Sequence, residues 1–381
     1  MAKEIKKTGS KHTKTTVKKT VDHVFLWLVI ILMSGGFFVF LSASLGLLAR
    51  EETNFGSVVV KQAITVFILG TAALYAFSRI PYEFWERHAL KVFALSTIAT
   101  ALVFVPGIGF RHGGATRWLD VGFTTLQPAE FLKFGVIVML AAFYAKHKGN
   151  IQTWTYGTLP LVGTLAITGA LMLAQPDTGT YLAILASACS IFIIAGGKKK
   201  HIALLVLLGV VAVGVLAYTR PYVRDRIETF LNPTEDIHGS AWQIRQSLYA
   251  VGSGGMMGKG FGQSVQKFGF LPEPIGDSIF SVAAEEFGFL GATLIILTFI
   301  IFLFRALTLA ARAPDTFSGL VVSGIAILIV FQAFLNIGAL LGVVPLTGLP
   351  LTFVSHGGTA ILFALAEAGV ILQISRYARK H

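Results

Sequence analysis

The stretch VFLWLVIILMSGGFFVFLSASLGLL at residues 24–48 carries no ionisable side chain over its whole length. A helix needs about 20 consecutive apolar residues to cross the hydrocarbon layer of a bilayer, so this stretch is long enough to span a membrane. Further apolar stretches follow it along the chain. The ten expected spans cover residues 24–48, 57–78, 89–106, 128–145, 157–174, 179–196, 201–219, 279–304, 317–341 and 357–374. The sequence therefore predicts an all-α polytopic membrane protein of about ten transmembrane helices.

The composition supports a membrane protein. Water-soluble domains carry about 25% charged residues, whereas this chain of 381 residues has 13%, with 54% hydrophobic residues and a mean hydropathy of +0.73. The formal net charge is +12, but the Lys and Arg residues lie in the tails and in short loops. That distribution is typical of membrane orientation and not of a nucleic-acid groove, so we expect no nucleic-acid partner. The single cysteine, Cys189, excludes an intramolecular disulfide, and no Cys/His spacing indicates zinc or haem.

The basic residues between the spans fall on alternate loops, which all lie on one side of the membrane. They are the N-terminal tail, Arg79, Arg87, Lys91, Lys146, Lys148, Lys198, Lys199, Lys200, Arg305, Arg312, Arg376, Arg379 and Lys380. Cytoplasmic loops of membrane proteins carry the excess of Lys and Arg. This side, with both termini, is therefore expected to be cytoplasmic.

The N-terminal tail is strongly basic, with seven Lys and one Glu in the first twenty residues. Such a segment is expected to be disordered and to face anionic lipid headgroups. A signal peptide cleaved near Ser42-Ala43-Ser44 is the alternative, but the apolar run is too long for one and more spans follow. We expect a basic tail at 1–22, a single membrane domain at 23–375 and a second basic tail at 376–381.

The loops on the opposite side cover 107–127, 175–178, 220–278 and 342–356, and most are long and rich in Gly, Pro and ionisable residues. Loops beyond about 12–15 residues are usually functional or disordered. In the large extracytoplasmic loop 220–278, apolar residues recur at helical spacing over 222–231, which predicts a helix lying in the membrane interface. A second helix is expected at 241–252, before a Gly-rich run at 252–262.

Six ionisable residues fall inside or beside the spans, where charge is costly and a functional role is expected. They are Glu130, Lys133, Asp177, Glu285, Glu286 and Glu367. Glu130 and Lys133 are three residues apart on one helix face, which fits either a structural ion pair or a substrate site. Gln127-Pro128 just before them is typical of a helix start.

Two residues at the outer membrane surface have a functional and a structural interpretation. Arg117 in the string GGATRWLD (113–120) could bind a phosphate in a bidentate manner or contact lipid headgroups. Asp177, in the short turn after Gln175, is well placed to cap the next helix.

The stretch 262–280 concentrates Lys267, Glu273 and Asp277 where a span begins. A carboxylate beside a cation suits proton abstraction or metal binding. The alternative for Asp277 is the N-cap of the following helix, and donors at a helix start would lower its pKa.

Five strings together resemble one protein family in order and spacing. They are GATRWLD (114–120), QPAEFLKF (127–134), QPDTGTYL (175–182), GKGFGQSVQKFGFLPEPIGDSIFSVAAEEFGFLG (258–291) and GLPLTFVSHGGT (348–359). This is the SEDS family of FtsW, RodA and SpoVE, and the resemblance covers nearly the whole chain after the tail. The family often has Lys and Tyr where this chain has Thr347 and His356.

The resemblance implies a peptidoglycan glycosyltransferase that polymerises lipid II at the outer face of the bacterial cytoplasmic membrane. It implies Asp277 as the catalytic residue, with Mg²⁺ or Mn²⁺ as a cofactor that Asp277 could hold. Cations for the pyrophosphate are expected from Arg117, Lys133 and Lys267. The full set of expected substrate contacts is Arg117, Glu130, Lys133, Gln175, Asp177, Gln243, Lys267, Glu273 and Ser355.

Within the family, the basic N-terminal extension and the string QSVQK (263–267) are more similar to the cell-division member FtsW than to RodA. That implies a place at the division septum, with a class B penicillin-binding protein and other division proteins as partners. A RodA-like elongation polymerase, a lipid II flippase and a scaffold are the alternatives. The polar candidates cluster on the outer side, which favours surface chemistry over transport.

Overall fold

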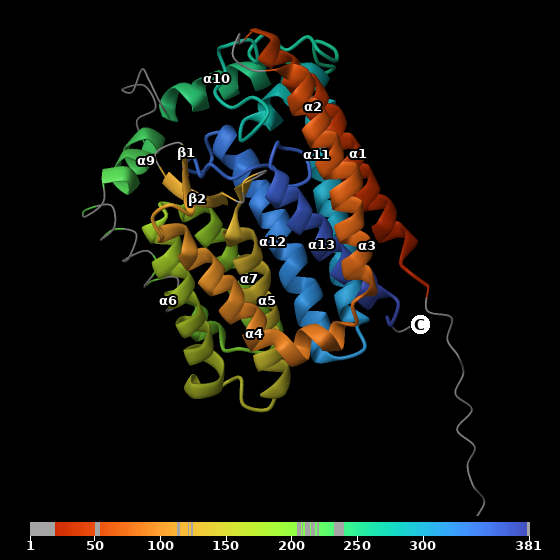
Figure 1. Cartoon of the computed structure of the whole chain (residues 1–381), viewed down its shortest axis with the longest axis vertical. Coiled ribbons are helices and arrows are strands. Elements are labelled where there is room, and N and C mark those ends of the chain that lie inside the picture. The colour runs from red at the N-terminus through yellow and green to blue at the C-terminus, as the bar shows by residue number, and fades with distance from the viewer. Residues whose placement is uncertain are drawn as a thin grey trace, which may run out of the picture.

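The computed structural model describes residues 20–49, 54–112, 115–120, 122, 125–203, 207, 209, 214, 218, 221–231 and 240–378. Over these residues the chain is a bundle of helices with one small sheet (Figure 1). Eight of the described helical segments are long and apolar enough to cross a membrane, and one shorter apolar helix joins them. The prediction of an all-α polytopic membrane protein is confirmed.

The helices follow the predicted spans closely. The main helices are α1 (His23–Ser44), α2 (Phe55–Ala63), α3 (Thr71–Arg79), α4 (Tyr82–Ala101), α5 (Pro128–Lys146), α6 (Leu159–Ala174), α7 (Thr178–Ile194), α9 (Pro221–Leu231), α10 (Ser240–Ser253), α11 (Ile279–Ala311), α12 (Thr316–Leu340) and α13 (Gly358–Ser375). Short 3-10 segments extend α1 and α4 as η1 (Leu45–Ala49) and η3 (Leu102–Phe104), and π-helical segments η2 (Ile64–Gly70) and η4 (Trp154–Thr158) join α2 to α3 and precede α6.

The core of the bundle is built from α5, α7, α12 and α13, which pack against one another. These helices are apolar on nearly all sides, as expected for helices that contact other helices or lipid rather than water. The polar start signals in the sequence set their first turns. Pro128 occupies the first turn of α5, and the carboxylates of Asp177 and Asp315 accept hydrogen bonds from the first backbone N–H groups of α7 and α12.

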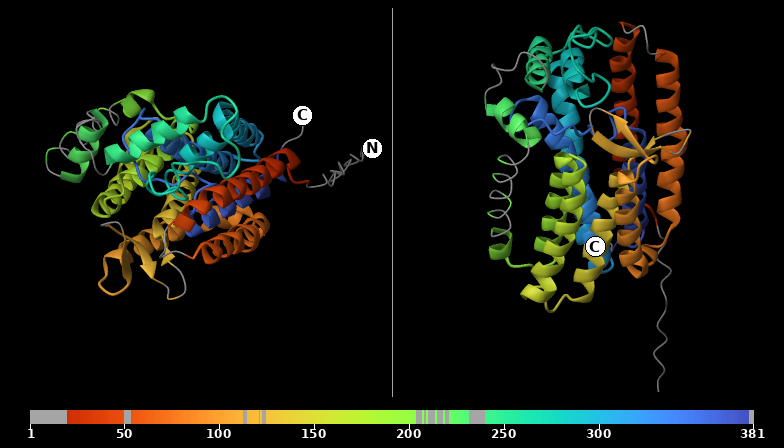
Figure 2. Two further views of the ribbon diagram at one scale, coloured as in Figure 1. Left: turned by 90° about the horizontal axis from the view of Figure 1, so that it is seen from above. Right: turned by 60° about the vertical axis from the view of Figure 1, so that its left-hand side comes forward.

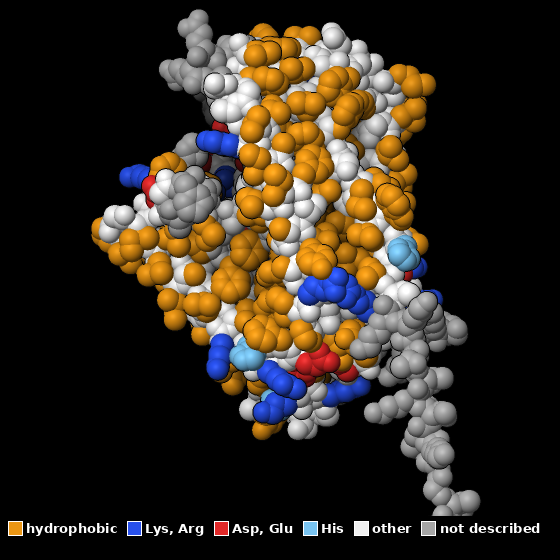
Figure 3. All heavy atoms as spheres, turned by 45° about the vertical axis from the view of Figure 1, so that its right-hand side comes forward, with side chains coloured by type: hydrophobic (Ala, Val, Ile, Leu, Met, Phe, Trp, Pro, Cys, Tyr) orange, Lys and Arg blue, Asp and Glu red, His pale blue; other side chains and the backbone are white. Residues whose placement is uncertain are grey.

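The two described ends of the chain lie at the same end of the bundle, here called the tail end. The backbone N–H of Asp22, before α1, donates to Ser375 Oγ at the end of α13 over 3.1 Å. At the opposite end, the loop end, lie α9, α10 and the connection 254–278 (Figures 1 and 2). Hydrophobic side chains cover the middle of the face drawn in Figure 3, and many of its charged side chains gather toward the tail end.

Strands occur in the loop 107–127, where the sequence analysis expected none. β1 (Gly109–His112), β2 (Ala115–Asp120) and β3 (Thr125–Leu126) form an antiparallel sheet in the order β1-β2-β3. Phe110 pairs with Trp118 and Leu119 pairs with Leu126. Strands this short carry little periodicity, so cross-strand pairing that is absent from the local sequence decides them.

Several expected boundaries need correction. α4 begins at Tyr82, so Arg87 and Lys91 lie on a helix and not in a loop; their long side chains can reach the membrane surface from there. The eighth expected span is longer, because α11 runs to Ala311. Helices are confirmed at both places expected in the loop 220–278, as α9 and α10. Most of the seventh expected span, 201–219, and most of the basic tail 1–22 lie outside the described residues.

Candidate functional site

Asp277 lies immediately before α11, in a tight turn that Glu273 begins. The backbone N–H groups of Gly276 and Ser278 both donate to the carbonyl oxygen of Glu273, over 3.0 and 3.1 Å. Glu273 has a φ of 45°, a left-handed conformation uncommon outside glycine. The N-cap of α11 is Ser278 and not Asp277, and no side chain caps this helix. The interpretation of Asp277 as an N-cap is therefore wrong, because Asp277 lies one residue before the N-cap position.

Side chains from three other segments form hydrogen bonds with this turn. Asn336 Nδ2 in α12 donates to the carbonyl oxygen of Asp277 over 2.7 Å, and Ser355 Oγ donates to that of Gly276 over 2.8 Å. Gln243 Nε2 in α10 donates to Ser278 Oγ over 2.9 Å. Ser355 and Gln243, both expected to contact substrate, thus position the backbone around Asp277.

The charges around Asp277 come from the neighbouring Glu273 and from three distant parts of the chain. Burial raises the pKa of Asp277 to about 6, and the negative charges of Glu273 and Asp177 act in the same direction. Arg117 and Arg226 lower it. A dominant effect of burial is the usual reason for a carboxyl with a raised pKa. The sequence analysis expected the opposite direction, because it placed Asp277 at a helix start.

Two arginines face this carboxylate. Arg117 in β2 donates from Nε to the carbonyl oxygen of Gln175 over 3.2 Å, and from Nη2 to that of Pro176 over 2.5 Å. Arg226 in α9 donates to the carbonyl oxygen of Leu346 over 2.7 Å. Guanidinium groups carry five donors each in a fixed plane, and these contacts orient the two side chains.

The sequence analysis did not single out Arg226. Two positions earlier, Arg224 pairs with Glu228 over 2.6 Å on the exposed face of α9. Residues two apart on a helix point in nearly opposite directions. Arg226 therefore points inward where Arg224 points outward, and the helical period was the signal available in the sequence.

Glycine at position 348 is required where the segment 341–357 passes this group. A Cβ on Gly348 would lie 3.5 Å from Asp277 Oδ2 and 3.8 Å from Arg226 Nη2. The φ of Gly348 is 67°, which side chains rarely adopt. The backbone of this segment thus passes beside the Asp277 carboxylate.

Glu130 and Lys133 lie inside the bundle. Lys133 Nζ pairs with Glu130 over 2.8 Å and donates to Gln332 Oε1 over 2.7 Å, and all three side chains are buried. With Glu367 and Thr352 they line a cavity of about 10 Å³, enough for about one water molecule. This geometry favours the structural interpretation of the pair, which joins α5 to α12.

Gln175 and Asp177 have structural contacts beside the site. Gln175 Nε2 donates to the carbonyl oxygen of Thr100 over 3.1 Å, and Asp177 caps α7 as one interpretation predicted, accepting from the Thr180 backbone N–H over 3.2 Å. Both residues are buried, and Arg117 contacts the turn between them.

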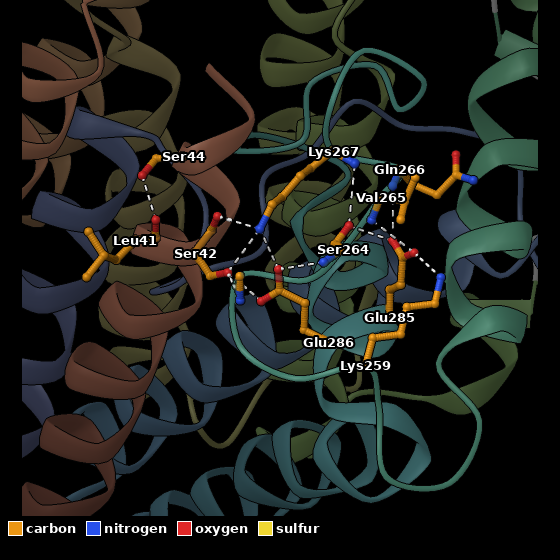
Figure 4. A network of polar contacts seen from close by, with 11 residues as sticks. Leu41, Ser42, Ser44, Lys259, Ser264, Val265, Gln266, Lys267, Glu285 and Glu286 are labelled. Atoms are coloured by element: carbon orange, nitrogen blue, oxygen red, sulfur yellow. Dashed lines mark hydrogen bonds and ion pairs between the residues drawn. The ribbon is translucent and has the colours of Figure 1, made fainter. Parts of the chain in front are cut away.

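Lys267 belongs to a separate cluster, drawn in Figure 4. Its ammonium is fully buried, pairs with Glu286 over 2.6 Å and donates to the carbonyl oxygen of Ser42 over 3.1 Å. The expectation that Lys267 contacts a pyrophosphate does not fit this placement, because its donors already have partners within the protein.

The donors present fit a divalent cation only in part. Among the described residues, no group of three or more His, Cys, Asp or Glu is close enough to hold a metal ion. Mg²⁺ is often bound by one or two carboxylates together with substrate phosphates, so the carboxylates near Asp277 satisfy that weaker requirement.

Known proteins resemble the chain over its length. The FtsW/RodA/SpoVE family model, described as cell cycle protein, matches residues 22–380. Stage V sporulation protein E of Bacillus subtilis (strain 168) is 35% identical over 365 residues, which cover 96% of this chain and 100% of that protein. The probable peptidoglycan glycosyltransferase FtsW of Trichlorobacter lovleyi is 37% identical over 359 residues, 93% of each chain.

Solved structures share the fold. One chain of "Structural coordination of polymerization and crosslinking by a peptidoglycan synthase complex" is 26% identical with a TM-score of 0.78, covering 95% of this chain and 99% of that one. The rod shape determining protein RodA of Thermus thermophilus is 24% identical with a TM-score of 0.67 over the same shares.

This chain belongs to the FtsW/RodA/SpoVE family. It is a multi-pass membrane protein and an enzyme of the glycosyltransferase class.

Proposed function

We propose that this protein polymerises lipid II into glycan strands and that Asp277 is its general base. The observation that carries the proposal is the position of Asp277 between Arg117 and Arg226, with a pKa raised to about 6. A carboxyl group with such a pKa is ionised at neutral pH. It is still basic enough to accept the proton of the attacking sugar hydroxyl. The relatives named as peptidoglycan glycosyltransferases support the substrate class.

The proposed reaction is a single displacement. The C4 hydroxyl oxygen of the acceptor sugar forms a bond to C1 of the donor, and the hydroxyl proton passes to the Asp277 carboxylate. The bond from C1 to the pyrophosphate oxygen breaks, and undecaprenyl pyrophosphate leaves with the electron pair. Because the attack comes from the face opposite the leaving group, the configuration at C1 inverts.

The two arginines supply the charge that the leaving group needs. Pyrophosphate carries negative charge that increases as the bond to C1 breaks, and guanidinium groups bind phosphate oxygens in a bidentate manner. We assign this task to Arg117 and Arg226. The carboxylates near Asp277 would hold a Mg²⁺ or Mn²⁺ ion, which would neutralise further charge on the pyrophosphate.

The proposed orientation places the loop end outside the cytoplasmic membrane and both termini inside. It follows from the basic residues on alternate loops. Lipid II then reaches the site with its tail in the bilayer and its sugars in the outer loops. We further propose a role in cell division beside a class B penicillin-binding protein and other division proteins, which the FtsW names of many relatives favour over elongation.

A lipid II flippase is the competing function. It needs a polar path through the whole membrane for a large charged headgroup. The polar cluster of Glu130, Lys133 and Glu367 in the bundle encloses only about 10 Å³. A cavity of this size cannot hold the headgroup, which favours a reaction at one membrane surface over transport.

The test is polymerisation by the purified protein. Lipid II is incubated with the full chain and Mg²⁺ or Mn²⁺, with and without its penicillin-binding protein, and the glycan products are separated by size. We expect polymer from the wild type and none from Asp277→Asn. Transport of lipid II across vesicles without any polymer, under every condition, would overturn the proposal.

A further inference from the structure

The network in Figure 4 joins three segments that are far apart in the chain. Glu286 Oε1 accepts from Lys267 Nζ over 2.6 Å, while Glu286 Oε2 accepts from Ser42 Oγ in α1. Ser42 Oγ in turn accepts from the backbone N–H of Gly262 over 3.0 Å. Both charged side chains are fully buried. The chain after α10 is thereby joined to both α1 and α11.

The neighbouring Glu285 binds the same loop at other points. Its carboxylate accepts from Lys259 Nζ over 2.6 Å, from Ser264 Oγ over 2.5 Å and from the backbone N–H of Val265 over 3.2 Å. Charge-assisted hydrogen bonds of this kind are among the stronger ones. The carboxylates of Glu285 and Glu286 thus bind residues 259–267 of the loop at several points.

A break in α11 makes room for this arrangement. Gly288 has φ 65° and ψ −164°, which are not helical values. The carbonyl oxygens of Glu285 and Glu286 accept from the backbone N–H groups of Lys259 and Gly260, over 3.0 and 2.9 Å. The loop therefore replaces hydrogen bonds that the helix loses at the break, as apolar surroundings require.

The contact is too close for side chains at two glycines. A Cβ on Gly258 would lie 2.1 Å from the Glu286 carbonyl oxygen, and a Cβ on Gly288 would lie 2.3 Å from the Gly258 nitrogen. At the α1 side, a Cβ on Gly46 would lie 2.5 Å from the Lys267 carbonyl oxygen. The backbone of the loop therefore packs directly against α11 and the end of α1, in addition to the contacts of the ion pair.

The seated loop leads directly to the catalytic residue. From Lys267 the chain continues through the buried Leu271 to Asp277, and α11 begins two residues later and returns to Glu286. Trp242 Nε1 in α10 holds the middle of this segment by donating to the carbonyl oxygen of Phe270 over 2.9 Å. The ion pair thus closes a ring of chain that contains Asp277.

We propose that the Lys267–Glu286 pair, braced by Ser42, is a positioning device that sets where Asp277 stands relative to the two arginines. This inference rests on the proposed function of Asp277. A buried ion pair adds little net stability compared with an apolar pair, so stability alone does not account for the pair. A misplacement of about 1 Å at a reacting group can cost ~10²-fold in rate, which makes a closed ring of this kind effective for positioning.

The experiment removes both charges together. A single Lys267→Met would leave Glu286 buried and unpaired and could unfold the protein. Lys267→Met combined with Glu286→Gln leaves no uncompensated charge and keeps an oxygen that accepts from Ser42. We expect normal melting temperature and KM, a kcat lowered by ~10²-fold, and faster hydrogen exchange of the backbone amides of 259–268. Normal kcat in this folded variant would overturn the inference.

Two further variants make the result decisive. Ser42→Ala removes the bracing hydroxyl without changing any charge, and it should lower kcat in the same direction with KM unchanged; normal kcat there also counts against the inference. The matched control is Asp22→Asn with Arg305→Gln, which removes an ion pair that joins the start of α1 to α11 at the tail end. Its kcat should equal that of the wild type, and an equal loss in the control would show that any link between these helices has the same effect.

The proposed function fails separately from this inference. If Asp277→Asn keeps full polymerase activity, the assignment of the base is wrong. If Asp277→Asn is inactive and the uncharged pair is fully active, only the positioning role is wrong.

Discussion

The side-chain amide of Asn336 donates a 2.7 Å hydrogen bond to the carbonyl oxygen of Asp277. The same nitrogen donates to the carbonyl oxygen of Leu349 over 2.7 Å. One residue of the core helix α12 thereby holds two loops together at the point where they meet beside the site. Because a buried carbonyl without a donor costs free energy, this contact constrains both loops at once.

Replacing this amide tests how strongly α12 holds the site. Asn336→Ala leaves two carbonyl oxygens without their donor, and we expect stability to fall by about 1–3 kcal/mol. Turnover should fall as well, because Asp277 loses its fixed backbone. Melting temperature and polymer yield measure the two effects. Ser323→Ala is the control on the same helix, since its hydroxyl donates within α12 to the carbonyl oxygen of Gly319 one turn away; unchanged turnover in Asn336→Ala would contradict the expectation.

Asp277→Asn should abolish catalysis without unfolding the protein. Asn has nearly the same size but cannot accept a proton at neutral pH, so we expect polymer formation to fall by at least ~10²-fold. Binding of lipid II should persist, because the two arginines remain. A wild-type rate in this variant would exclude Asp277 as the base, and Glu273 would be the next carboxylate to replace.

Activity should depend on pH around the pKa of Asp277, which burial raises to about 6. The base form exists above that pH, so kcat/KM should fall as the pH drops through about 6. The contribution of Asp277 to the free energy of unfolding should change in the opposite direction and decrease as the pH rises. The pKa in the folded state is above the ordinary value of 3.8, so Asp277 favours folding when protonated, and that contribution is lost as the pH rises from about 3.8 to about 6. Melting curves should therefore show that the stability of Asp277→Asn relative to wild type is greater at about pH 8 than at about pH 4.

Arg117→Lys and Arg226→Lys should each lower turnover although the charge is kept. Lysine provides a point charge and cannot reproduce the planar donors that bind phosphate and the loop carbonyls together. Loss of one transition-state donor costs about 10²-fold in rate at comparable sites. Arg224→Lys on the exposed face of α9 is the matched control and should be fully active. Equal activity in all three variants would remove the arginines from the proposed mechanism.

The orientation is testable with reporter fusions. Fusions after about residues 50, 115 and 250 should report outside the cytoplasm, and fusions after about residues 84, 148 and 199 inside. The reporters are an enzyme active only in the periplasm or cell exterior and a fluorescent protein that matures only in the cytoplasm. A cytoplasmic signal at about residue 250 would place the loop end, and with it Asp277, on the wrong side for the proposed reaction.

The membrane fold follows from local properties of the chain, and the candidate catalytic residue follows from a motif. Apolar length predicted the described spans, since each helix must satisfy its own backbone in lipid. The start of α4 was predicted too late, because its first turns contain charged residues such as Arg87 and were taken for a loop. The strands β1 to β3 were not predicted, because pairing between short segments leaves almost no local signal in the sequence.

The partners of each charged residue were decided by the tertiary structure. From the sequence, Arg117, Lys133 and Lys267 were equivalent candidates for a phosphate, yet only Arg117 lies beside Asp277. Lys133 and Lys267 pair with Glu130 and Glu286 inside the protein, and Arg226 joins the site from another helix. The sequence alone determined which residues carry charge and which segments cross the membrane. Electrostatic interaction depends on distance and burial, and the packing of segments far apart in the chain decides both.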